Sequence, residues 1–253
     1  MIAWRNGALG DFVLTLPALD RLAEEGPLTV IAPARYAALF PRAAEWIDAD
    51  GPVATGIFAG RVRLDHDVGV AWTAGAADAL ARAGVREVLA GRPHPPPGVH
   101  AADSLWEPLR ARWGPRDRDP RVAGASLAAH AGAVVLSPGS GGTRKRWPLT
   151  RWRAVADAIA GCLWVGGPVE AGEPGWGSPR RDDLDLAGLV GLATVARAWL
   201  GPDSGPLHLA AAAGCRVGAV FVDTDPACWA PIGGRVFSAD TTPDALTAWA
   251  TGG

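Results

Sequence analysis

The chain has 253 residues, of which 49% are hydrophobic, and its formal net charge is −2. This length allows one large domain or two domains of about 120 residues each. So balanced a charge gives no indication of a nucleic-acid partner or of an acidic tail.

The N-terminal residues and the cysteines indicate in which cellular compartment the protein is expected. Residues 1–11 lack the basic and apolar regions of a signal peptide, and no apolar run approaches the length of a membrane span. Cys162, Cys215 and Cys228 show no CxxC spacing, and each lies in or near an apolar stretch. Buried thiols suit a reducing compartment and give no metal site. We therefore expect a soluble, cytoplasmic protein.

Short apolar runs alternate with helical patterns through the first half of the chain. Residues 1–5 predict a strand, residues 6–11 a glycine-bearing loop, and residues 12–23 a helix with apolar residues three or four apart. Further strands are predicted at 28–32, 46–47, 68–72 and 85–89, and helices at 36–40, 76–83 and 101–113. This alternation predicts a parallel sheet with helices on its faces.

A charged, turn-rich stretch without apolar side chains, residues 114–120, is the best candidate for a linker. The alternation then restarts. Strands are predicted at 133–136, 162–165, 184–186, 198–200 and 217–222, and helices at 150–159, 205–213 and 242–250. We expect two Rossmann-like lobes, 1–118 and 119–253, with a cleft between them, and the last helix can pack back on the first lobe.

Asp11 closes the loop after the first strand, at the carboxyl end where open α/β sheets place their ligands. The loop is not GxGxxG, so a dinucleotide fingerprint is absent. One interpretation is a helix cap. The other is a carboxylate that takes a proton from an incoming nucleophile.

Residues 137–148 (SPGSGGTRKRWP) combine glycine-rich backbone with cations after a predicted strand. Ser140, Gly141, Thr143 and Lys145 can form a phosphate cradle, although the spacing is not that of a Walker A loop. The alternative is a solvated basic loop. Glu170 follows the next strand and could accept hydrogen bonds from ribose hydroxyls, or could simply be solvated.

Residues 200–214 (LGPDSGPLHLAAAAG) predict the end of a buried strand, a tight turn and a helix N-terminus. Asp203 or Ser204 can cap the helix, and Gly205 lies in its first turn with His208 pointing back toward it. Free backbone N–H groups and the helix dipole make this an anion site. The alternative is an ordinary strand-to-helix connection with a core histidine.

Metal chemistry is not indicated. Five D-x-D pairs occur in one chain, so the pattern identifies no particular site, and there is no HExxH.

Together these stretches resemble glycosyltransferase family 9, the ADP-heptose:lipopolysaccharide heptosyltransferases. The matching pieces follow the order of the family and span nearly the whole chain: residues 7–11 with 17–19, then 137–140, 145–148 and 201–213. The resemblance implies a GT-B fold, in which two Rossmann-like lobes with parallel sheets face each other across a cleft. The N-terminal lobe would take the acceptor and the C-terminal lobe the nucleotide-sugar.

The resemblance also implies roles for individual residues. Asp11 would be the general base, and Lys145 the lysine of the family's K-x-W-P segment. The donor would contact Ser140, Gly141, Thr143, Glu170, Asp203, Ser204, Gly205 and His208. We expect Asp203 to orient its turn by accepting backbone N–H groups rather than to face the phosphates. The chain departs from the family in its shorter length and in residues 185–191, which lack a Gly-Lys-Thr-like segment.

The expected function is therefore inverting, metal-independent transfer of a heptose or related sugar. The donor would be a nucleotide-diphosphate sugar such as ADP-heptose, and the acceptor a hydroxyl of a glycan or lipopolysaccharide-type molecule. No cofactor, no nucleic acid and at most peripheral contact with the inner face of a membrane are expected. The alternatives are a catalytically silent nucleotide-sugar-binding module and a GT-B-type nucleotide-sugar epimerase.

Overall fold

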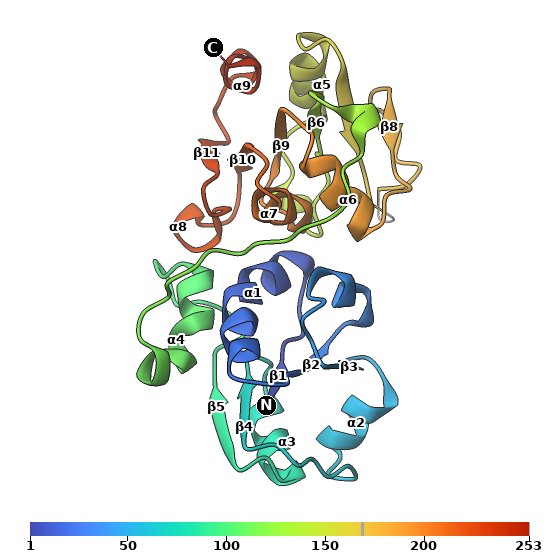
Figure 1. Ribbon diagram of the computed structural model, residues 1–253. Helices are drawn as coiled ribbons and strands as arrows, with labels where there is room; N and C mark the ends of the chain where they lie inside the picture. The colour runs from blue at the N-terminus through green and yellow to red at the C-terminus, as the bar shows by residue number, and fades with distance from the viewer. Residues whose placement is uncertain (168–169, 253) are drawn as a thin grey trace. The chain divides into compact units, whose positions relative to one another are not determined.

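The computed structural model describes residues 1–167 and 170–252 (Figure 1). The chain divides into two compact units, Met1–Pro120 (unit 1) and Arg121–Gly253 (unit 2). Among the described residues, no helix is both long and apolar enough to cross a membrane.

Unit 1 is built on a five-stranded parallel sheet in the order β3-β2-β1-β4-β5. The strands are β1 (Ile2–Trp4), β2 (Thr29–Ala32), β3 (Glu45–Asp48), β4 (Val68–Ala71) and β5 (Glu87–Ala90). The helices are α1 (Leu9–Glu24), the 3₁₀ helix η1 (Ala34–Leu39), α2 (Pro52–Phe58), α3 (Ala76–Ala83) and α4 (Ala101–Trp113). The three inner strands are buried along their whole length, as expected for a parallel sheet covered on both faces.

Alternation along β1 directs its side chains to opposite faces of this sheet. Ile2 and Trp4 pack with Leu80 and other residues of α2 and α3 in one core cluster. Helices α1 and α4 pack against each other, and Figure 1 shows them on the other side of the sheet from α2 and α3.

Unit 2 has a six-stranded parallel sheet in the order β11-β10-β9-β6-β7-β8. The strands are β6 (Val134–Leu136), β7 (Cys162–Val165), β8 (Arg180–Arg181), β9 (Ala198–Pro202), β10 (Val217–Phe221) and β11 (Arg235–Ser238). The helices are the 3₁₀ helices η2 (Ala128–His130) and η3 (Thr143–Lys145), then α5 (Leu149–Asp157), α6 (Leu186–Ala193), α7 (Gly205–Ala212), α8 (Pro226–Trp229) and α9 (Pro243–Thr251). Helices α5 and α9 pack together, as do α6 and α7.

One expectation about unit 2 is wrong. Residues 184–186 do not form a strand: Asp185 caps α6, where its Oδ1 accepts a hydrogen bond from the Gly188 N–H at 2.7 Å. The edge strand of the sheet is instead β8, which consists of Arg180 and Arg181. The apolar residues that follow Asp185 form α6. The last helix, α9, packs on α5 and β9 of its own unit, where Leu246 and Ala250 join the core.

Each sheet has a topological switch point, where successive strands are added to opposite sides of a central strand. In unit 1, β1 has β2 on one side and β4 on the other, and in unit 2, β6 lies between β9 and β7. Ligands of open α/β sheets bind at the carboxyl ends of the strands beside such points. The loop after β1 carries Asp11, and the loops after β6 and β9 carry Lys145 and Asp203.

Candidate active site

Asp11 is the third residue of α1 and its carboxylate is held on both oxygens. Its Oδ2 accepts a hydrogen bond from the Ala8 N–H at 3.1 Å, which is the capping role, and its Oδ1 lies 3.2 Å from Nη2 of Arg5. The side chain keeps 17% exposure, so the carboxylate is both oriented and reachable. The cap and the candidate base are therefore one and the same group.

Arg5, which the sequence interpretation missed, fixes Asp11. It follows β1 directly and is 3% exposed. Its Nη1 donates to the carbonyl oxygens of Pro93, at 3.2 Å, and Trp72, at 3.4 Å. Burial lowers the pKa of Arg5 even though Asp11 counteracts the shift. A buried arginine at the carboxyl end of the first strand was the available signal, because such a charge needs an acidic partner.

Gly7 makes room for this arrangement. Its φ is +141°, and a Cβ there would lie 2.9 Å from Asp11 Oδ2. The glycine is required both by the backbone conformation and by the close approach of the carboxylate.

In unit 2 three segments converge on the carboxylate of Asp203. Lys145 Nζ, from the loop after β6, donates to Oδ2 at 2.7 Å. Thr224, from the loop after β10, donates its hydroxyl to the same oxygen at 2.9 Å. His208 Nε2, from α7, lies 3.5 Å from Oδ1. Thr224 was also missed, although it follows a strand at the same edge of the sheet.

The partners of Asp203 determine its charge. Its side chain is 5% exposed, and burial alone would raise the pKa of the carboxyl group. Hydrogen bonds from His208 and Lys145 outweigh burial and hold the pKa of Asp203 below its ordinary value. The carboxylate is thus ionised and fixes the ammonium group of Lys145 at the edge of the sheet.

The expectation that Asp203 caps the helix through backbone N–H groups is wrong. Ser204 occupies the cap position of α7 and its side chain makes no capping hydrogen bond. Ser204 Oγ and His208 Nδ1 are buried and without a hydrogen-bond partner among the described residues. Gly205 is the first residue of α7 and Pro206, which has no N–H, is the second. The Gly205 N–H therefore lies at the helix end, near the buried Ser204 Oγ and His208 Nδ1.

The loop after β6 lies beside this helix end. Ser140 is buried and its Oγ donates to the Asp203 carbonyl oxygen at 3.3 Å. Thr143 opens η3 and is exposed, and a Cβ on Gly141 would meet nothing within 4 Å. The structure therefore brings Ser140 and Lys145 together with Asp203, and leaves Gly141 and Thr143 on the open side of the loop.

Glu170 is buried, with 7% exposure, so the solvated alternative is wrong. Its Oε1 accepts from Arg146 Nη2 at 3.1 Å and its Oε2 accepts from the Gly167 N–H at 3.1 Å. Arg146 also approaches the Ser140 carbonyl oxygen at 3.4 Å. Arg146, missed from the sequence, thereby joins the loop after β7 to the phosphate-type loop.

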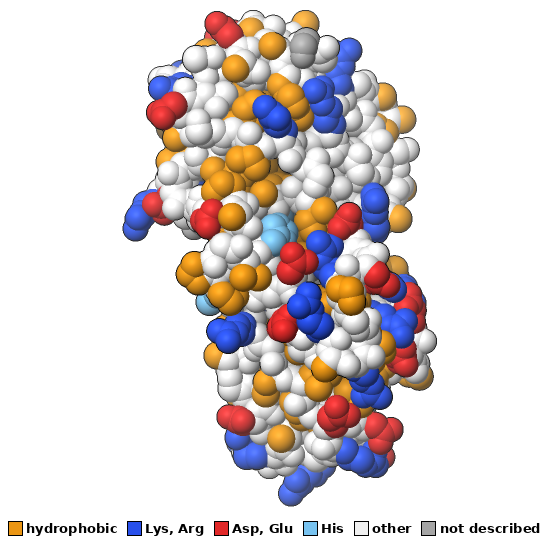
Figure 2. Space-filling view, turned by 90° about the vertical axis from the view of Figure 1, so that its left-hand side faces the viewer, with side chains coloured by type: hydrophobic (Ala, Val, Ile, Leu, Met, Phe, Trp, Pro, Cys, Tyr) orange, Lys and Arg blue, Asp and Glu red, His pale blue; other side chains and the backbone are white. Residues whose placement is uncertain are grey.

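Two further observations concern charge. Within residues 1–167 and 170–252, no group of three or more His, Cys, Asp or Glu side chains could hold a metal ion. Figure 2 shows basic and acidic side chains interspersed on the face in view.

The model of glycosyltransferase family 9 (heptosyltransferase) matches residues 182–242, which include Asp203, Ser204, His208 and Thr224. Among solved structures, the chain is similar to E. coli ADP-heptose LPS heptosyltransferase II, with a TM-score of 0.78 and 17% identity over 99% of this chain and 97% of that one. It is also similar to a family 9 glycosyl transferase from Veillonella parvula DSM 2008, with a TM-score of 0.75 and 17% identity over 99% and 90% of the two chains. The chain is similar as well to E. coli heptosyltransferase WaaC with ADP, with a TM-score of 0.72 and 14% identity over 99% of this chain and 98% of that one. No curated protein matches the chain.

These findings confirm the resemblance and the fold class that it implied. The chain has the α/β fold of the GT-B heptosyltransferases, with one parallel sheet in each unit. The family 9 model matches only residues 182–242, so the similarity in sequence is confined to that segment, while the similarity in fold covers the whole chain.

Proposed function

We propose that the protein is an inverting, metal-independent glycosyltransferase. It would move a heptose or related sugar from a nucleotide-diphosphate donor to a hydroxyl of a glycan or lipopolysaccharide-type acceptor. ADP-heptose is the proposed donor, because the similar E. coli enzymes are named for ADP-heptose or solved with ADP. The proposed location is the cytoplasm.

The observation that carries the proposal is the ion pair between the buried Asp203 and the partly exposed Lys145, beside the start of α7. Asp203 occupies one of the three protons of the Lys145 ammonium group, which leaves two for a ligand. Ser204 Oγ lacks a partner among the described residues, and a diphosphate would supply one to this hydroxyl and to the Gly205 N–H at the first position of α7. Such donors stabilise the charge that accumulates on a departing nucleoside diphosphate.

The composition supports an individual role for this ammonium group. Lys145 is the only lysine in the sequence, whereas arginine is abundant. A compact ammonium group and a planar guanidinium are not equivalent beside a carboxylate and a phosphate. The lysine lies where three segments converge on Asp203.

In unit 1 we assign the general base to Asp11. It would take the proton of the acceptor hydroxyl while the hydroxyl oxygen bonds to the anomeric carbon and the carbon–oxygen bond to the diphosphate breaks. Attack from the side opposite the leaving group inverts the anomeric centre. Arg5 is a positioning residue, because it holds Asp11 Oδ1 while Ala8 holds Oδ2.

The test is transfer by the purified full chain, supplied with ADP-heptose and a lipopolysaccharide-core acceptor, with and without excess chelator. Release of ADP with a glycosylated product, unchanged by chelator, supports the proposal. Donor binding without turnover would instead indicate the silent module, and an epimerised sugar the epimerase. Activity lost to chelator and restored by magnesium or manganese would overturn metal independence.

A further inference from the structure

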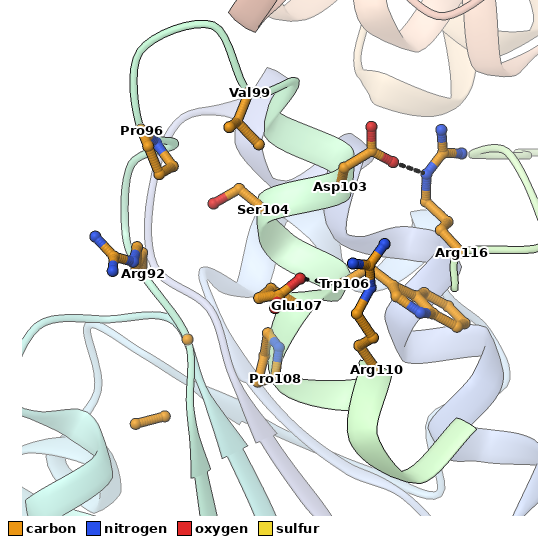
Figure 3. A pocket seen from close by; sticks show the side chains of 12 residues that line it. Arg92, Pro96, Val99, Asp103, Ser104, Trp106, Glu107, Pro108, Arg110 and Arg116 are labelled. Carbon is orange, nitrogen blue, oxygen red and sulfur yellow. Dashed lines mark hydrogen bonds and ion pairs between the residues drawn. The ribbon is translucent and has the colours of Figure 1, made fainter. Parts of the chain in front are cut away.

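Unit 1 contains a pocket of about 450 Å³ beside α4, remote in sequence from Asp11 (Figure 3). One wall is the loop after β5, with Arg92, Pro96 and Val99, and the other wall is α4. The pocket begins where β5 ends, at the carboxyl edge of the sheet that also carries the loop with Asp11. None of the residues assigned to transfer lines it.

The arginines that line the pocket differ in their ion pairs. Arg116 pairs with Asp103 at 2.8 Å and with Asp119 at 2.7 Å, and Arg110 approaches Glu107 at 3.7 Å. Arg92 is exposed and makes no ion pair with any described residue. One guanidinium group at the pocket is therefore uncompensated, which suits an anionic ligand group.

The helix wall offers an acceptor. Pro108 lies inside α4 and has no N–H, so the carbonyl oxygen of Ser104 lacks its α-helical donor. Both residues line the pocket, and Figure 3 shows Ser104 and Glu107 on the helix, with Val99 on the loop that precedes it. A ligand hydroxyl can donate to this carbonyl oxygen.

Both walls are braced from beneath. Trp72 Nε1 donates to the Leu105 carbonyl oxygen at 2.7 Å, which fixes α4. A Cβ on Gly91 would overlap the Trp72 ring, so the glycine lets the loop lie against it. Arg5 donates to the Pro93 carbonyl oxygen at 3.2 Å and holds the loop next to Arg92. A braced pocket loses little entropy when a ligand binds.

We propose that this pocket binds a sugar that carries one carboxylate or phosphate group. The anionic group contacts Arg92, and ring hydroxyls donate to the Ser104 carbonyl oxygen and to Glu107. The apolar face of the ring packs on Val99 and Pro96. The volume is in the range of small-molecule sites. The proposal does not depend on sugar transfer, because binding is measured without a donor.

The experiment is calorimetric titration of the full chain with glucuronate, glucose 6-phosphate and neutral glucose. The two anionic sugars are expected to bind saturably, and glucose at least tenfold more weakly. Arg92→Ala should weaken both anionic sugars about tenfold. Arg61→Ala, which removes another exposed arginine of unit 1 that makes no ion pair with a described residue, should change nothing.

Pro108→Ala separates recognition from folding. It returns an N–H to the helix, so the melting temperature should rise while the affinity for all three sugars falls. The methyl glycoside of glucuronic acid, run beside the free acid, tells whether the ligand is the end of a glycan or a free metabolite. Absence of saturable binding by both anionic sugars, or equal affinities in Arg92→Ala and Arg61→Ala, would overturn the proposal. Unchanged affinity in Pro108→Ala would remove the carbonyl contact from it.

Discussion

Lys145 Nζ donates to Asp203 Oδ2 at 2.7 Å, across 58 residues of sequence. This contact ties the loop after β6 to the turn after β9. The carboxylate is almost fully buried, while the lysine side chain keeps 34% exposure. Asp203 therefore has a structural role, while the ammonium group of Lys145 is accessible to a ligand.

The buried Asp203 carboxylate predicts that the free energy of unfolding depends on pH. Because the folded pKa of Asp203 lies below its ordinary value of 3.8, its contribution is fully present above about pH 4 and is lost as the pH falls through the folded pKa. Asp203→Asn should lower the free energy of unfolding at pH 7 by about 1–3 kcal/mol. Denaturant unfolding between pH 7 and pH 3 should show this difference shrinking at the acid end.

Asp240→Asn, at an exposed aspartate of the same unit, is the control and should leave stability within about 0.5 kcal/mol at every pH. A difference between wild type and Asp203→Asn that stays constant down to pH 3 would contradict this account of Asp203.

Asp11→Asn tests the base. The amide keeps an oxygen for the Ala8 N–H but cannot take a proton, so turnover should fall by about a hundredfold or more while ADP binding is retained. The buried Arg5 loses its counter-charge, so melting curves must accompany the rates. Asp20→Asn, on the same helix and paired with Arg42, should keep wild-type turnover. Near-normal transfer by Asp11→Asn would remove Asp11 from the mechanism.

Two glycines of the loop after β6 form a matched pair. A Cβ on Gly139 would lie 2.6 Å from Glu170 Cδ, whereas a Cβ on Gly141 would meet nothing within 4 Å. Gly139→Ala should cost about 1–3 kcal/mol of unfolding free energy, because Glu170 and its partner Arg146 must shift. Gly141→Ala should stay within about 0.5 kcal/mol and weaken ADP binding instead. Equal stabilities of the two variants would show that Glu170 is free to move.

The single lysine permits a direct footprint. An amine-acylating reagent can modify only Lys145 and the N-terminal amine, and mass spectrometry separates the two products. Saturating ADP should protect Lys145 at least fivefold and leave the N-terminus unchanged, and adenosine should protect neither. Protection by adenosine as strong as by ADP would place the lysine away from the phosphates.

The sequence predicted best the elements with strong periodicity or clear boundaries. Helices α3 and α4 and strand β7 run over the predicted residues. The missed elements are the helices α2, α6 and α8, the 3₁₀ helices η2 and η3, and the strands β8 and β11. Apart from α2 and α6, each has four residues or fewer, too few to show an apolar periodicity. The strand expected at 184–186 failed because Asp185, between the two leucines, caps the helix that begins at Leu186.

The sequence predicted the loops that form the candidate site but not the contacts between their side chains. Glycine-rich turns after strands identified the loops, because carboxyl ends of parallel strands share an edge. The partners of each charge depend on tertiary contacts over long sequence separations. The sequence therefore shows where Arg5, Arg146 and Thr224 lie relative to the strands, but not which groups they contact. For the same reason a capping role was assigned to Asp203, whose carboxylate instead binds Lys145.

The most direct test of the account is calorimetric titration of ADP and of adenosine into wild type and Lys145→Ala. If the diphosphate lies between Lys145, Ser140 and the start of α7, the variant should lose roughly 1.5–3 kcal/mol of binding free energy for ADP. Its affinity for adenosine should change much less, since the nucleoside carries no phosphate. Equal losses for ADP and adenosine, or no loss for either, would contradict a donor diphosphate at this site.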